Sequence, residues 1–138
     1  MTILDTNVVS EFMLHSPNPK VLGWLNGQPR SSLWTTAITI FEIRLGLQIM
    51  PSSKRRDALN QRFDEVLARM NEQIVPFDTE AARHAASLMA SRKMQGRPRD
   101  LRDTMIAGIV LARHATLATR NISHFDDLSA PLIDPWSI

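Results

Sequence analysis

Short apolar segments that suit β-strands alternate along this chain with longer segments whose apolar residues recur at helical spacing. The strand-like segments span residues 2–5, 32–36, 74–77 and 115–119, and a fifth is expected at 132–133. Strands that alternate with helices predict an α/β fold. We expect a mainly parallel central sheet of four to five strands, flanked by helices on both faces.

Capping residues mark where several helices begin. Asn18 can cap a helix that has Pro19 at its first position, and the run Pro51-Ser52-Ser53 ends one helix and caps the next. A later helix begins with either Asp78 or Thr79 as its cap. The chain contains no repeat, linker or low-complexity segment, and its 138 residues are enough for one ordinary core. We therefore expect one domain over residues 1–138.

Composition excludes several classes of protein. The chain has no cysteine, so disulfides and thiolate metal sites are ruled out. Its four histidines show no metal-ligand spacing, and each is expected at the surface or at a helix end. No apolar stretch is long enough to cross a membrane, and the N-terminus lacks the features of a signal peptide. These observations predict a soluble, cytoplasmic protein.

Three acidic residues occur where apolar residues surround them. Asp5 follows the first strand-like segment directly. Glu42 is spaced at i−4, i+3 and i+7 from Ile38, Leu45 and Ile49, which predicts that it lies on the buried face of a helix. A carboxylate in such a place is costly unless something positive pairs with it.

Asp103 begins a helix and shares its face with Ile106, Ala107 and Val110. Taken singly, each acid has an ordinary explanation. Asp103 can cap its helix, Asp5 can be a turn residue, and Glu42 can pair with Arg44 or with a distant arginine. Taken together, three acids in apolar surroundings favour a shared divalent-metal site.

The topology also brings these acids together. Parallel sheets place their sites at the carboxyl ends of the strands. Asp5 ends the first strand, Glu42 lies just inside the helix after the second, and Asn121 follows the fourth. Asp103 can reach the same edge from its helix N-terminus. Because the five glycines are scattered, the sequence lacks the glycine-rich loop of a nucleotide-binding site.

Four motifs, in order, resemble those of PIN-domain ribonucleases. They are Leu-Asp-Thr-Asn-Val at 4–8, Phe-Glu-Ile-Arg-Leu-Gly at 41–46, Arg-Asp-Thr-Met-Ile-Ala at 102–107 and Leu-Ala-Thr-Arg-Asn at 117–121. The chain is most similar to VapC-type toxins, including the FitB-like group. The resemblance covers essentially the whole chain. It implies an endoribonuclease that depends on Mg²⁺ or Mn²⁺ and is neutralised by a small DNA-binding antitoxin.

The resemblance also implies roles for individual residues. Metal binding and catalysis fall on Asp5, Glu42 and Asp103, and the supporting polar residues would be Thr6, Asn7 and Thr119. The sequence departs from the family at the fourth acidic position, where Asn121 can orient a water but cannot act as a base. The family's Asp-Phe pair appears as His124-Phe125. We therefore expect one firmly held metal ion in the absence of RNA.

The RNA and protein partners follow from the charge and apolar patterns. A basic cluster consists of Arg92, Lys93, Arg97, Arg99 and Arg102, and a solvated helix face would explain it. Alternatively, Arg97, Arg99 and Arg102 would form a basic lip for the RNA backbone. The apolar stretch 38–50 and the helix after it contain more apolar residues than one domain needs. We assign part of that surface to the antitoxin, in a hetero-oligomer, and part of the remaining apolar surface to a homodimer.

Two other classes of protein fit parts of this pattern. One is a metal-free binding module whose acidic pocket pairs with a partner's arginines. The other is a signalling domain that is phosphorylated on Asp5, which would need adjacent acids after the first strand, and none are present. A metal titration combined with an RNA cleavage assay separates these classes from a nuclease.

Overall fold

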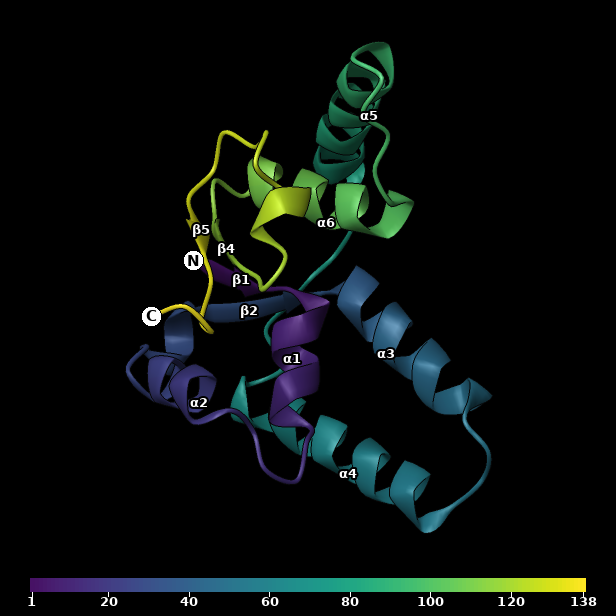
Figure 1. Cartoon of the computed structure of the whole chain (residues 1–138), viewed down its shortest axis with the longest axis vertical. Helices are drawn as coiled ribbons and strands as arrows, with labels where there is room; N and C mark the ends of the chain where they lie inside the picture. The colour runs from purple at the N-terminus through teal and green to yellow at the C-terminus, as the bar shows by residue number, and fades with distance from the viewer.

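The computed structural model describes residues 1–138 and is built around one sheet of five parallel strands in the order β3-β2-β1-β4-β5 (Figure 1). The strands are β1 (Thr2–Leu4), β2 (Leu33–Thr36), β3 (Ile74–Val75), β4 (Thr116–Ala118) and β5 (Leu132–Ile133). The predicted α/β fold is therefore confirmed, and every strand pair is parallel. Most of the strand predictions were one or two residues too long at an end.

Six α-helices and two short 3-10 helices connect the strands. The α-helices are α1 (Thr6–Phe12), α2 (Pro19–Asn26), α3 (Ala37–Ile49), α4 (Lys54–Arg69), α5 (Thr79–Met94) and α6 (Leu101–Ala112). The 3-10 helices are η1 (Arg30–Ser32) and η2 (Ile122–His124). None of the helices combines the length and apolar character needed to cross a membrane.

The predicted helix caps are present where the sequence places them. The Asn18 side chain accepts a hydrogen bond from the Lys20 amide at 2.9 Å, and Ser53 caps α4. The choice between Asp78 and Thr79 falls on Asp78, whose carboxylate accepts from the amide of Ala81 at 3.0 Å. These caps satisfy amides that have no partner within a helix, so they fix where each helix begins.

Two cores lie on the two faces of the sheet, because successive strand residues point to opposite faces. Leu4 and Ala118 face α1 to α4, where their core includes Phe63. Ile3 and Leu117 face α5 and α6 in the second core. In Figure 1 the two helix groups lie on opposite sides of the sheet. The fold thus has three layers.

Helices α5 and α6 pack so closely that their contact requires glycine at 108. A Cβ atom at Gly108 would collide with the carbonyl oxygen of Ala81 and lie 2.8 Å from the Cβ of Ala85. Residues of the second core surround this contact on α6, and Ile106, Ile109 and Val110 are all fully buried. The position of α6, and of the acid in its first turn, is therefore set by backbone packing.

The strand order reverses between β1 and β4. The chain first adds β2 and β3 on one side of β1, and later adds β4 and β5 on the other. Crevices at such a switch point, outside the carboxyl ends of the strands, are where open α/β sheets bind ligands. β1 ends at Leu4 and β4 at Ala118, which are paired in register. The polar residues that follow these two strands therefore lie side by side.

Candidate active site

Asp5 is the first residue after β1 and caps α1. One carboxylate oxygen accepts from the Thr6 amide at 2.8 Å, and the other accepts from the Thr119 hydroxyl at 2.7 Å. The residue is only 2% exposed and has no cationic partner. Burial raises the pKa of Asp5 to about 6, the charges of Asp103 and Glu42 add to that rise, and the two hydrogen bonds oppose it.

A polar network joins the start of α1 to the segment after β4. The Asn7 side-chain amide lies 3.4 Å from the Asp5 carboxylate and 3.5 Å from the Thr119 hydroxyl. In return, Asn7 Oδ1 accepts from the Arg120 amide at 3.2 Å. The amide of Asn121 donates to the Thr119 hydroxyl at 3.0 Å, while its side chain points to no protein partner. The network holds both switch-point strands in place around Asp5.

Glu42 lies on α3 and approaches Asp5 through Thr6. The Thr6 hydroxyl donates to Glu42 Oε1 at 3.0 Å, and Arg102 Nε lies 4.0 Å from Glu42 Oε2. The Glu42 side chain is 21% exposed. Its pKa is raised, first by burial and also by the charges of Asp103 and Asp100, although Thr6 and Arg102 act in the opposite direction.

The predicted position of Glu42 on the buried face of its helix is wrong. The buried residues of α3 are Thr39, Ile43 and Leu47. Leu45 and Ile49, which share a face with Glu42, are 41% and 74% exposed. Because the helix is apolar on nearly every side, spacing alone did not identify the side that faces the core. Glu42 instead borders an exposed apolar surface.

The ordinary explanation of Glu42 as a partner of Arg44 is also wrong. Arg44 pairs with Asp64 on α4 at 2.9 Å, and its guanidinium lies 4.6 Å from the centre of the Phe63 ring. The only distant arginine near Glu42 is Arg102, whose Nε lies at the limit of ion-pair distance from the Glu42 carboxylate. Glu42 therefore has one loose cationic neighbour.

Asp103 lies in the first turn of α6 without being its cap. Asp100 caps the helix by accepting from the amides of Arg102 and Asp103, at 2.9 and 3.2 Å. The carboxylate of Asp103 is consequently free for other contacts, and its Oδ2 lies 3.1 Å from Nδ1 of His124. His124 was expected at the surface or at a helix end, and it is exposed at the end of η2, but nothing in the spacing of the sequence indicated its contact with Asp103.

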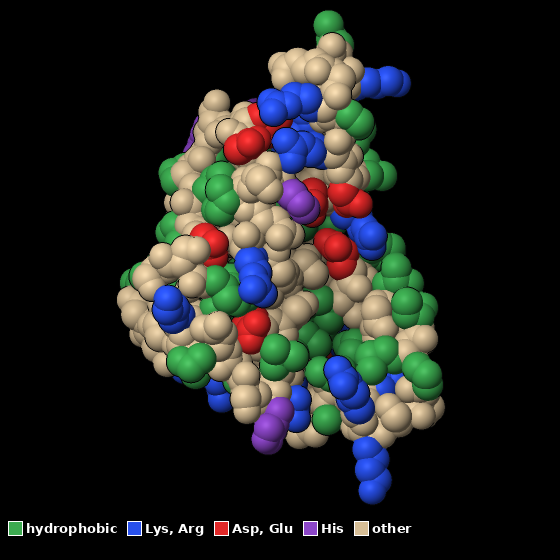
Figure 2. Space-filling model, in the orientation of Figure 1, with side chains coloured by type: hydrophobic (Ala, Val, Ile, Leu, Met, Phe, Trp, Pro, Cys, Tyr) green, Lys and Arg blue, Asp and Glu red, His purple; other side chains and the backbone are tan.

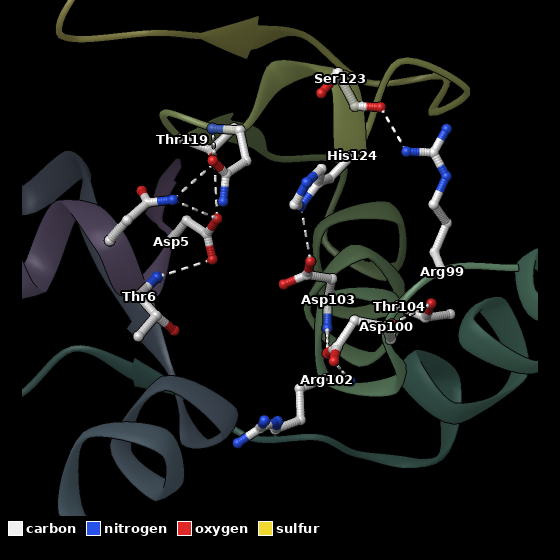
Figure 3. Close-up of polar contacts among 12 residues, drawn as sticks. Asp5, Thr6, Arg99, Asp100, Arg102, Asp103, Thr104, Thr119, Ser123 and His124 are labelled. Carbon is white, nitrogen blue, oxygen red and sulfur yellow. Dashed lines mark hydrogen bonds and ion pairs between the residues drawn. The ribbon is translucent and has the colours of Figure 1, made fainter. Parts of the chain in front are cut away.

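The three acids come from different elements and act on one another. Figure 3 shows Asp5 and Asp103 directed toward each other from opposite sides, with His124 and Arg102 beside Asp103. The pKa values of Asp5 and Glu42 are raised first by burial, and the negative charge of Asp103 adds to both rises. Figure 2 shows acidic side chains and a histidine gathered near the centre of this face, with basic side chains nearby.

A hard divalent cation suits this group of side chains. The donors are carboxylate oxygens, which Mg²⁺ and Mn²⁺ favour, and a bound cation would offset the repulsion among the three acids. No three acidic or histidine side chains approach one another closely enough to ligate one ion directly. Bridging waters or side-chain rotation must therefore complete any coordination, as is usual for Mg²⁺.

The basic residues predicted to bind RNA differ in their surroundings. Arg97 is exposed, and the Arg102 side chain is 44% exposed beside Glu42. Arg99 instead donates to the carbonyl of Ser123 at 2.7 Å and lies 3.6 Å from Asp126. Arg99 thus contacts the loop after β4, as Figure 3 shows.

A buried arginine, which belongs to the basic cluster of the sequence, anchors that loop. Arg92 is 2% exposed and makes two hydrogen bonds of 2.8 Å to the carboxylate of Asp127. It also donates to the Thr104 hydroxyl at 3.0 Å and to the carbonyl of His124 at 3.2 Å. The hydrogen bonds from Arg92 hold the pKa of Asp127 below its usual range. A solvated helix face is therefore the wrong description of Arg92.

A cavity of about 560 Å³ lies away from this site. It lies between α2 and α4, and its lining includes Leu25, Arg62 and Met70. None of the three acids lines it. This cavity is therefore separate from the group of three acids.

Comparison with known proteins agrees with this geometry. The family model of the PIN domain matches residues 2–130 of this sequence. The chain is 39% identical over 137 residues to VapC ribonuclease Y4jK of Sinorhizobium fredii, covering 99% of this chain and 98% of that protein. It is 31% identical to toxin FitB of Neisseria gonorrhoeae, covering 99% of each. The chain therefore belongs to the PIN-domain family. Within that family it belongs to the VapC-type ribonucleases.

Solved structures give the same result for the fold. The crystal structure of FitAcB from Neisseria gonorrhoeae superimposes with a TM-score of 0.89 at 30% identity, over the full length of both chains. A second structure, of FitAB bound to a DNA fragment, gives the same TM-score and identity. In both comparisons the likeness covers the full length of this chain.

Proposed function

We propose that this protein is a VapC-type toxin that hydrolyses RNA phosphodiester bonds with the help of Mg²⁺ or Mn²⁺. The observation that carries the proposal is the buried, cation-free Asp5 at the switch point of the sheet, whose pKa is raised first by burial and also by the charges of Asp103 and Glu42. The catalytic unit is the PIN domain formed by residues 1–138, which meets its substrate in the cytoplasm.

Asp5, Asp103 and Glu42 would hold the metal. When bound, the ion activates water and offsets the charge that develops at phosphorus. The chain's own residues prepare the ligands for this task. Thr6 and Thr119 orient the Asp5 carboxylate, and His124 orients that of Asp103. Ligands fixed in this way by neighbouring polar groups bind metal more tightly.

Glu42 is suited to accept the proton of the attacking water. Its raised pKa lies closer to neutral pH than that of an ordinary glutamate, and a base whose pKa is near the working pH is more effective. The Thr6 hydroxyl fixes one of its oxygens and leaves the other facing Arg102. Asn121, whose side chain has no protein partner, would orient a water molecule beside Asp5.

We also propose that an antitoxin covers part of α3. Phe41, Leu45 and Ile49 lie on one face of that helix and are 55%, 41% and 74% exposed. Figure 2 shows apolar side chains exposed along this part of the molecule. Apolar residues gathered this way mark a surface for association. We assign the remaining exposed apolar surface to a homodimer, within a toxin–antitoxin hetero-oligomer.

Inhibition would follow from the same acids. An arginine or lysine of the antitoxin would pair with Asp5, Glu42 and Asp103 and exclude the metal, since guanidinium groups bind carboxylates in a bidentate manner. Replacing that arginine with alanine should leave the complex associated but partly active. If the complex cleaved RNA at the rate of the free toxin, inhibition by this route would be ruled out.

The direct test is RNA cleavage by the purified, antitoxin-free chain. We expect EDTA to abolish cleavage, and Mg²⁺ or Mn²⁺ to restore it. Asp57→Asn, which alters an exposed acid on α4, is the matched control for the loss of one negative charge and should leave cleavage intact. Full activity in EDTA would reject the proposal. A chain that binds neither metal nor RNA, yet captures an arginine-rich partner, would indicate the metal-free binding module.

A further inference from the structure

An arginine held against a tryptophan lies at the rim of the proposed active site. Arg120 is exposed, and its guanidinium carbon lies 5.0 Å from the centre of the Trp136 ring. These residues are far apart in the chain, since Arg120 follows β4 and Trp136 belongs to the tail after β5 (Figure 1). Trp136 is partly buried and packs against the core beneath α1 to α4. The ring therefore gives the guanidinium a fixed platform.

The backbone of Arg120 is tied to the active-site network. Its amide donates to Asn7 Oδ1 at 3.2 Å, and its neighbours in the chain are Thr119 and Asn121. The Trp136 amide in turn donates to the carboxylate of Asp134 at 2.9 Å, which holds the tail. The backbone of Arg120 is thus tied to the network around Asp5, and that of Trp136 is tied to Asp134.

The hydrogen-bonding edge of the Arg120 guanidinium is unused. Its side chain forms no ion pair and donates no hydrogen bond to the protein. Arg92, Arg99 and Arg102, by contrast, each have an acidic partner within 4.0 Å. A planar guanidinium whose face rests on an aromatic ring keeps its edge free to bind phosphate oxygens.

The phosphates of an RNA strand at this site would be repelled by the three carboxylates, and Arg120 can offset that repulsion. One metal ion compensates the scissile phosphate, but the flanking phosphates still approach three carboxylates. Cations at the rim are needed to hold them. Arg102 lies on the Glu42 side of the acids, and Arg120 lies on the β4 side, next to the network that surrounds Asp5.

We propose that Arg120, oriented by Trp136, binds a backbone phosphate of the nucleotide next to the scissile bond. The RNA backbone then crosses the carboxylates between Arg102 and Arg120. This inference rests on the proposed RNA-cleaving function and adds a binding residue that acts on affinity for the strand.

The experiment measures binding of a short fluorescein-labelled single-stranded oligoribonucleotide of mixed sequence. The full chain carries Asp5→Asn in every sample so that the probe is not cleaved. Arg120→Gln should raise Kd roughly five- to tenfold and reduce the slope of log K against log salt by about 0.7, the value for one phosphate contact on a single strand. Thermal midpoints verify that each variant is folded.

Arg30→Gln is the matched control. Arg30 precedes β2, whereas Arg120 follows β4, so the two residues lie at opposite ends of the parallel strands. Like Arg120, Arg30 is exposed and has no ion pair. The control should leave both Kd and the salt slope at the parent values. Equal effects of Arg120→Gln and Arg30→Gln would overturn the proposal, because only bulk charge would then be acting.

The tryptophan is tested separately. Trp136→Leu removes the ring, and should weaken probe binding without changing the salt slope, while Trp136→Phe should retain binding. If Trp136→Leu bound RNA like the parent, the claim that the Trp136 ring orients Arg120 would be wrong. Failure of the proposed function is distinguishable, since wild-type chain that neither binds nor cleaves RNA with Mn²⁺ would reject the nuclease, whereas a nuclease indifferent to Arg120→Gln would reject this inference alone.

Discussion

The fold disfavours the charged form of Asp5, so the stability of the protein should depend on pH. A carboxyl whose pKa is higher in the folded chain than in the unfolded chain stabilises the fold at low pH, and this contribution is lost as the pH rises through the folded value. For Asp5 the two values are 3.8 and about 6, which corresponds to a loss of about 3 kcal/mol in the free energy of unfolding.

The prediction concerns the metal-free protein in EDTA. As the pH rises from about 4 to about 7, the free energy of unfolding of the wild type should fall relative to that of Asp5→Asn, because the variant has no carboxyl at this position to titrate. Urea unfolding at several pH values measures the difference between the two proteins. A difference that did not change with pH would mean that Asp5 titrates normally.

The three acids should differ from Asn121 in their effects on RNA cleavage. Asp5→Asn and Asp103→Asn should each remove nearly all activity, and Glu42→Gln should nearly do so, since the amides bind metal poorly and accept no proton. Asn121→Asp should be tolerated, because it adds a carboxylate beside an existing site. Initial rates of cleavage with saturating Mn²⁺ provide the measurement. Near-normal cleavage by Asp5→Asn would place the site elsewhere.

At the scale of elements, Arg92 joins the end of α5 to α6 and to the loop after β4. Its guanidinium contacts Thr104, the residue after Asp103, and the backbone of His124, whose ring contacts Asp103. The same side chain thus holds both residues of the Asp103–His124 pair in place. Loss of this anchor should loosen the loop and lower stability together.

Arg92→Met should lower the free energy of unfolding by about 3 kcal/mol, the low end for breaking a buried ion pair, because Asp127 remains 28% exposed. Hydrogen exchange at the amides of residues 124–128 should become faster as well. Lys93→Met is the matched control, since Lys93 is the exposed neighbour on the same helix, and it should change little. Equal urea midpoints for the two variants would contradict the role of Arg92 as an anchor.

The exposed face of α3 leads to a prediction about assembly. Leu45→Lys should leave the thermal midpoint of the free chain almost unchanged, because the residue is already 41% exposed, but it should prevent complex formation with the antitoxin. Gln61→Lys, which adds the same charge on α4, is the control. Copurification with the protein encoded by the upstream reading frame measures the effect. An intact complex with Leu45→Lys would move the antitoxin to another surface.

For the whole molecule, local patterns were sufficient to predict the architecture. Strand–helix alternation predicted the parallel sheet, and the caps at Asn18 and Ser53 were correct because capping depends on residues a few positions apart. Asp5 was placed at the sheet edge for the same reason. The orientation of α3 was not predictable from spacing, since apolar residues surround that helix and only tertiary packing decides which side is buried.

Contacts between distant segments account for what the sequence did not reveal. His124 meets Asp103 across 21 residues, and Arg92 meets Asp127 across 35. No local spacing identifies such pairs, because the chain between them can take many paths. Arg120 and Trp136 are likewise brought together only by the order of β4 and β5 in the sheet. The fold was therefore easier to predict than the surroundings of its carboxylates.

The central claim is that the carboxylates of Asp5, which follows β1, of Glu42 on α3 and of Asp103 on α6 together bind a divalent cation. Calorimetric titration of Mn²⁺ into the antitoxin-free chain tests this claim most directly, with Asp5→Asn and the exposed-acid control Asp57→Asn alongside. The wild type and Asp57→Asn should bind the ion with the same affinity, and Asp5→Asn should lose nearly all binding. Equal binding by Asp5→Asn and the wild type would contradict the account.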